Sequence, residues 1–153
     1  MSISSIISAF FGLMVLVACA GFVLYLQQVR WRWFSDRFGM RELPRETAGK
    51  PGAAIVFSAK PHRELLGTDY TTYLSIRLAL HQDGLSVRVR EPNYYGNRPF
   101  LLPFDGIQVQ PSRWPDLLYE TVAVSHRSLP NAYLVMARSD IDWAIAQGAP
   151  ISI

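Results

Sequence analysis

The opening of the chain is continuously apolar, whereas the rest alternates between apolar and polar positions. From Met1 to Val29 no side chain is charged, and Ile6–Leu26 is apolar almost without interruption. At about 1.5 Å per residue, a helix of this length crosses the roughly 30 Å hydrocarbon core of a bilayer. The pattern predicts an N-terminal transmembrane helix over residues 1–29.

Period-two alternation begins after the polar stretch Glu42–Gly52 and predicts strands with one buried face. The clearest run is Tyr73–Leu80, and Leu85–Arg90 alternates in the same way after the turn residues Asp83-Gly84. Asp-Gly between alternating runs predicts a hairpin, with leucines facing valines on the core side. We expect further strands at 53–58, 100–104, 107–110, 121–126 and 133–138.

Proline and capping residues refine this picture. Pro99 and Pro103 cannot donate ladder hydrogen bonds, so the strand near them is expected to be short or at an edge. A closing helix is predicted with Ser139 as its N-cap and with Gly148 and Pro150 ending it.

Two local patterns carry a resemblance to a known family. Asp83–Val87 is a strand that follows a tight turn, and Leu101–Ile107 has the order hydrophobic residue, proline, aromatic residue, two residues, isoleucine. Together with six or seven strands before one helix, these segments resemble bacterial PH-like and GRAM-like domains. The resemblance implies a mainly-β domain over residues 53–153, a bent β-sandwich or partly open barrel with a C-terminal helix. It brings no catalytic residue, and the dense basic loop of lipid-binding members has no counterpart here.

Charge predicts the orientation of the chain in the membrane. Residues 30–51 hold six basic and three acidic side chains, whereas nine of each follow from Gly52 onward. Because the Lys- and Arg-rich flank stays in the cytoplasm, we expect an inner membrane protein of bacterial type, single-pass, with its N-terminus outside and its domain in the cytoplasm. Positive charge confined to this flank argues against nucleic acid as a partner.

Residues 30–52 are predicted to form a basic, aromatic juxtamembrane segment and linker. Amphipathic rings and arginines would meet the lipid headgroups as a membrane-interface belt of Tyr25, Arg30, Trp31, Arg32 and Trp33. If the helix continues, Trp31, Phe34 and Phe38 share a stripe suited to lying along the leaflet, with Pro44 ending the helix.

Two further hypotheses concern the apolar segment. Leu16-Val17-Ala18-Cys19 resembles a lipobox, so the alternative to a retained anchor is a lipoprotein acylated at Cys19 with its domain outside the cytoplasm. The small residues Ser4, Ser8 and Gly12 lie on one helix face and suit self-association.

The residues that could act in catalysis or bind a metal match no known catalytic or metal-binding motif. His62, His81 and His126 have no metal-ligand spacing, and Cys19 is the single cysteine. The sequence therefore predicts no catalytic residues, no metal and no cofactor.

One cluster of like charges stands out on the outer face of the predicted hairpin. Arg77 faces Arg90 if the loop has two residues, and Arg88 if it has four. Like charges opposite one another are destabilising unless an anion joins them, so Arg77, Arg88 and Arg90 are predicted to bind an acidic peptide or a phosphate group. The alternative is a solvated face neutralised by Glu91 or other local carboxylates.

These inferences favour a non-catalytic, membrane-anchored binding or scaffold protein. The bilayer and a protein partner or membrane complex are its expected partners. An enzyme with no recognisable motif is the remaining alternative.

Overall fold

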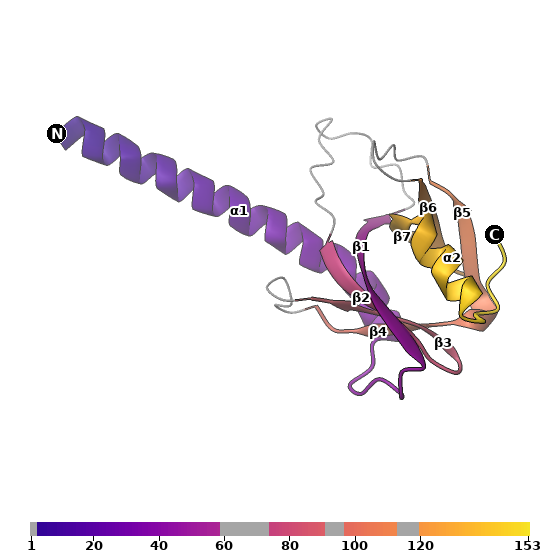
Figure 1. The fold of residues 1–153 in the computed structure, drawn as a ribbon. Helices are drawn as coiled ribbons and strands as arrows, with labels where there is room; N and C mark the ends of the chain where they lie inside the picture. The colour runs from indigo at the N-terminus through magenta and orange to yellow at the C-terminus, as the bar shows by residue number, and fades with distance from the viewer. Residues whose placement is uncertain (1–2, 59–73, 91–96, 113–119) are drawn as a thin grey trace.

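The computed structural model describes residues 3–58, 74–90, 97–112 and 120–153 (Figure 1). Within these residues a long helix precedes a seven-stranded antiparallel sheet, and a short helix follows it. The elements are α1 (Ile3–Phe38), β1 (Ala48–Ser58), β2 (Leu74–Leu80), β3 (Gly84–Val89), β4 (Phe100–Pro103), the 3-10 turn η1 (Phe104–Gly106), β5 (Ile107–Pro111), β6 (Thr121–His126), β7 (Leu129–Ala137) and α2 (Arg138–Ala146).

The sheet has the order β4-β3-β2-β1-β7-β6-β5, and β1 belongs to both of its halves. Residues 48–54 of β1 pair with β2, whereas residues 54–58 pair with β7. Ala54 takes part in both ladders, so the partner of β1 changes at this residue. The sheet is not closed, and its two edge strands, β4 and β5, are joined in the chain only by η1.

The predicted β2–β3 hairpin is confirmed, with the four-residue loop. Leu80 lies opposite Leu85 and Leu78 opposite Val87, so leucines and valines face the core together. The alternating core positions of both strands are buried, namely Leu74, Ile76, Leu78, Leu80, Leu85, Val87 and Val89. β4 is an edge strand, as its prolines predicted.

The helix α1 joins the apolar segment to the core of the domain. Its stretch from Ser4 onward is long and apolar enough to cross a membrane, and none of its most apolar part is buried. Farther along the same helix, Trp31 and Phe34 are completely buried. Their rings lie 5.0 and 5.2 Å from the ring of Phe100, and the Trp31 indole N–H donates to the carbonyl of Arg98 at 2.9 Å. Figure 1 shows α1 projecting away from the sheet as a single rod.

The end of α1 differs from the prediction. The stripe of Trp31, Phe34 and Phe38 exists, but it packs against the domain rather than along a leaflet. The helix ends at Phe38, before Pro44, because Gly39 leaves it to pair with Phe100 at the edge of β4. A Cβ at Gly39 would lie 2.0 Å from the carbonyl oxygen of Ser35, so this turn requires glycine.

Two predicted strands are longer than expected. β1 begins at Ala48 rather than Ala53, because Ala48–Ala53 pairs with β2 alone and a strand bonded on one side accommodates Pro51. β7 begins at Leu129 rather than Tyr133, because a tight turn at Arg127 and Ser128 carries β6 directly into it.

The N-cap prediction for α2 is wrong. β7 runs straight into the helix, so Ala137 occupies the N-cap position and no side chain caps the helix. Asp140 instead forms an ion pair of 2.6 Å with Lys50 of β1, whose ammonium group lies 5.8 Å from the centroid of Trp143. These contacts, with the buried Ile141 and Ala144, hold α2 on the sheet.

The substitution Phe34→Ala should lower the free energy of unfolding of the domain by about 3–5 kcal/mol, because it empties a fully buried ring site. Phe22→Ala is the matched control, since Phe22 lies on the same helix and is 61% exposed. Thermal unfolding of the full chain in detergent micelles measures both. Equal effects of the two variants would show that α1 contributes no core to the domain.

Candidate functional site

The structure brings the three predicted arginines to the outer face of β2 and β3. Arg77 lies directly opposite Arg88. The main-chain N–H of Arg90 donates to the carbonyl of Ser75 at 2.9 Å, which extends the pairing beyond β3. All three arginines are exposed, so the face carries three positive charges along one side of the hairpin.

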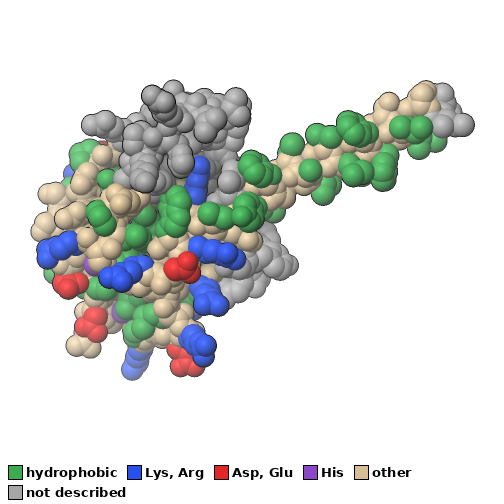
Figure 2. Space-filling model, turned by 180° about the vertical axis from the view of Figure 1, so that it is seen from behind, with side chains coloured by type: hydrophobic (Ala, Val, Ile, Leu, Met, Phe, Trp, Pro, Cys, Tyr) green, Lys and Arg blue, Asp and Glu red, His purple; other side chains and the backbone are tan. Residues whose placement is uncertain are grey.

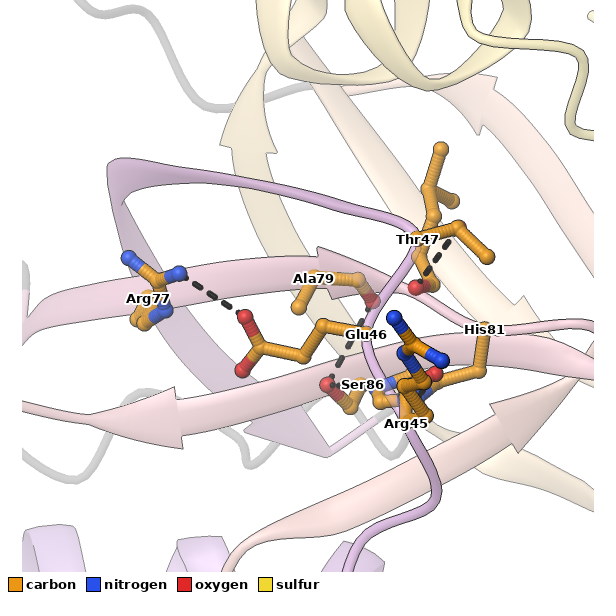
Figure 3. A network of polar contacts seen from close by, with 8 residues as sticks. Arg45, Glu46, Thr47, Arg77, Ala79, His81 and Ser86 are labelled. Carbon is orange, nitrogen blue, oxygen red and sulfur yellow. Dashed lines mark hydrogen bonds and ion pairs between the residues drawn. The ribbon is translucent and has the colours of Figure 1, made fainter.

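A carboxylate that the sequence did not single out joins this face. The Glu46 carboxylate accepts a hydrogen bond of 2.8 Å from Arg77 (Figure 3). This bond lowers the pKa of Glu46; partial burial opposes the effect, and the charges of Arg77 and Arg88 add to it. The same bond raises the pKa of Arg77. Glu46 therefore neutralises Arg77, one of the three arginines. In this respect the structure agrees with the alternative prediction, in which carboxylates neutralise the face.

The segment that carries Glu46 is fixed to the turn of the hairpin. The main-chain N–H and the hydroxyl of Thr47 both donate to the carbonyl of Leu80, at 2.8 and 2.9 Å. His81 is almost fully buried, and its Nδ1 lies 3.2 Å from the Arg45 carbonyl oxygen. Its Nε2 lies 2.8 Å from Ser86 Oγ, which donates to the Ala79 carbonyl (Figure 3). His81 is therefore a positioning residue of the turn.

Gly49 leaves room for the ion pair. A Cβ at this position would lie 2.8 Å from Arg77 Nη2 and 3.2 Å from Glu46 Oε2. Any larger residue would thus displace one of the two partners. Arg88 and Arg90 form no ion pair with any other described residue, and Glu91, which follows Arg90, lies outside the described residues.

The belt residues lie in two different environments. Tyr25 and Arg32 are exposed and Arg30 and Trp33 are partly buried, whereas Trp31 lies in the core. The Trp31 ring therefore packs inside the protein and is not available to lipid headgroups. Arg30–Phe38 and Ala48–Gly52 are parts of α1 and β1 rather than of a linker. Ser4, Ser8 and Gly12 are exposed on α1.

His126 lies where the last turn of α1 meets the sheet. Its ring is 4.7 Å from that of Phe38, edge to face, and a Cβ at Gly106 would meet it at 2.3 Å. Its Nδ1 accepts a hydrogen bond of 3.1 Å from the main-chain N–H of Ser128. Burial lowers the pKa of His126, an effect opposed by the charge of Asp105. His62 lies outside the described residues, and those residues contain no cluster of His, Cys, Asp and Glu that could hold a metal ion.

No protein-family model and no curated protein matches the chain. The chain is similar to a solved structure described as the C-terminal domain of an unknown protein from Leishmania infantum, at 10% sequence identity and a TM-score of 0.42. The similarity covers 69% of this chain and 83% of that one. At this level the likeness identifies neither a family nor a function.

The triple variant Arg77→Gln, Arg88→Gln, Arg90→Gln should bind a multivalent anion at least about tenfold more weakly than the parent chain, because it removes every cation of the face. Calorimetric titration of the full chain in detergent with tripolyphosphate measures the affinity. Glu46→Gln should bind more tightly, since it frees Arg77. Unchanged affinity in both variants would leave a solvated strand face as the correct interpretation.

Acidification should weaken the contact between α1 and the sheet through His126. Because its pKa is lower in the folded than in the unfolded chain, the unfolded chain binds more protons and the free energy of unfolding falls as the pH drops below about 6.5. His126→Asn keeps an acceptor for the Ser128 N–H and removes the titration. The melting temperature of the variant should therefore fall less than that of the parent between about pH 7.5 and pH 5.5. Parallel curves would contradict this role.

Proposed function

We propose that the chain is a single-pass inner membrane protein that holds a small PH-like domain against the cytoplasmic leaflet as a non-catalytic binding or scaffold module. The observation that carries the proposal is the continuity of α1, which is exposed and apolar in its first part and buried in the domain at Trp31 and Phe34. A domain that shares a helix with a membrane span is fixed at the membrane surface.

The strand arrangement supports the PH-like part of the proposal. Seven antiparallel strands are followed by one C-terminal helix, and β1 is shared by the two halves of the sheet. The sheet stays open between β4 and β5. This strand order, the shared β1 and the closing helix support a bent sandwich of the PH-like kind.

The charges near the domain support the orientation. The apolar part of α1 contains no Lys or Arg, whereas the positions that follow it include Arg30, Arg32 and Arg37. Lys and Arg in short segments next to a span favour the cytoplasmic side. The arginine face of β2 and β3 then points into the cytoplasm, where an acidic protein partner is its expected ligand.

Cysteine labelling in right-side-out bacterial spheroplasts tests the topology. In a Cys19→Ala background, Ser5→Cys should react with a membrane-impermeant maleimide, and Ser139→Cys, which is exposed on α2, should react only after lysis. Reaction of Ser139→Cys in intact spheroplasts would contradict a cytoplasmic domain.

The intact mass of the parent chain, purified from membranes, separates the anchor from the lipoprotein alternative. A retained anchor gives the mass of the unmodified chain with its apolar segment, because the span needs no acyl chain. A chain that begins at Cys19 and carries the added mass of acyl groups would favour the lipoprotein alternative instead.

A further inference from the structure

The start of the packed part of α1 lies at the depth of lipid headgroups when the apolar run fills the hydrocarbon core. Ile6–Leu26 is about 31 Å long as a helix, and Trp31 follows it by about 7 Å. The headgroup layer extends about 5–8 Å beyond the core on each side. The domain therefore begins within or just beneath this layer, with no spacer between span and sheet.

Three exposed arginines belong to segments that form or contact this end of the helix. Arg32 follows Trp31 on α1, and the carbonyl of Arg98 accepts the Trp31 indole N–H at 2.9 Å. After α1 ends, Gly39 pairs with Phe100 and the N–H of Met40 donates to the carbonyl of Pro99 at 3.3 Å. The next residues along these two antiparallel segments are Arg41 and Arg98.

This pairing brings the main chain of Met40, next to Arg41, against that of Pro99, next to Arg98. The segment before β4 runs from Phe100, near the end of α1, back to the Arg98 carbonyl at Trp31, two turns earlier on the helix. Arg32, Arg41 and Arg98 all have exposed side chains. Figure 2 shows basic side chains on the face of the domain near the helix and farther along it, with acidic side chains among them.

These three arginines, which we call the collar, have no carboxylate partner in the described parts of the chain. Asp36 and Glu42 are close in sequence and exposed, but neither forms an ion pair with a collar arginine. Like charges brought together without a carboxylate are stabilised by an external anion, and arginine binds phosphate through two parallel hydrogen bonds.

We propose that Arg32, Arg41 and Arg98 bind the phosphates of anionic phospholipids around the exit of α1. The inference rests on the proposed function, since it requires that α1 spans the bilayer. It adds a binding site that the domain itself contributes, because Arg98 belongs to the segment leading into β4 and reaches the helix only through the fold. The collar differs from the β2–β3 face, which we propose for a soluble partner.

The test uses the full chain in nanodiscs that contain equal amounts of phosphatidylglycerol and phosphatidylcholine. Native mass spectrometry measures which lipids stay bound when the protein is released from the disc. The parent chain should retain phosphatidylglycerol over phosphatidylcholine by about fivefold or more, as charge-assisted contacts of about 1 kcal/mol or more predict. Arg41→Gln combined with Arg98→Gln should bring this ratio close to one.

The control pair Arg45→Gln and Arg127→Gln removes the same total charge from exposed positions outside the collar. The control should keep the preference of the parent chain. Equal loss in both pairs would assign the preference to net charge and overturn the collar, as would a parent chain that retains both lipids equally. Failure of the parent chain to enter nanodiscs would instead overturn the transmembrane helix, on which both proposals depend.

Discussion

The aromatic contact of Trp31 and Phe34 with Phe100 is the constraint on which the rest of the architecture depends. It places residues of the long helix in the same core as the sheet, so α1 cannot be described as a tail attached to a finished domain. Phe100 lies on β4, an edge strand, and one side of this strand would otherwise be left without a neighbour. The end of α1 and the Gly39 bridge cover that edge, which removes a site for pairing with other chains.

Two sets of contacts attach the segment before β1 and the helix α2 to the sheet. The segment before β1 is bonded to the hairpin turn through Thr47 and His81, and this places Glu46 beside Arg77. At the other side of β1, Lys50 and Asp140 attach α2. Lys50 lies two residues from Gly52, where an added Cβ would already lie 3.0 Å from Asp140. The beginning of β1 thus serves the candidate anion face and the closing helix together, and it explains why small residues dominate there.

The sequence patterns predicted those features of the fold that depend on local periodicity. Alternation identified the β2–β3 hairpin and its core positions, and prolines identified the edge position of β4. Contacts between distant residues were not predictable in this way. The stripe of Trp31 and Phe34 suits a membrane surface and a protein core equally well, and only its partner Phe100 decides between them. Glu46 beside Arg77 gave no signal, because their proximity follows from the Ala48–Leu80 register rather than from spacing along the chain.

The helix α1 runs without a break from the apolar segment into the core. The position of the domain relative to the apolar segment therefore depends on the number of helical residues between them. Each residue inserted between Leu26 and Trp31 would turn the sheet by about 100° around the helix axis and raise it by about 1.5 Å. The length of the stretch between these two residues therefore sets how far the domain stands from the apolar segment and in which direction its faces point around the helix axis. Two chains with equal domains, but with spacers that differ by two residues, would differ by about 200° in the direction of these faces.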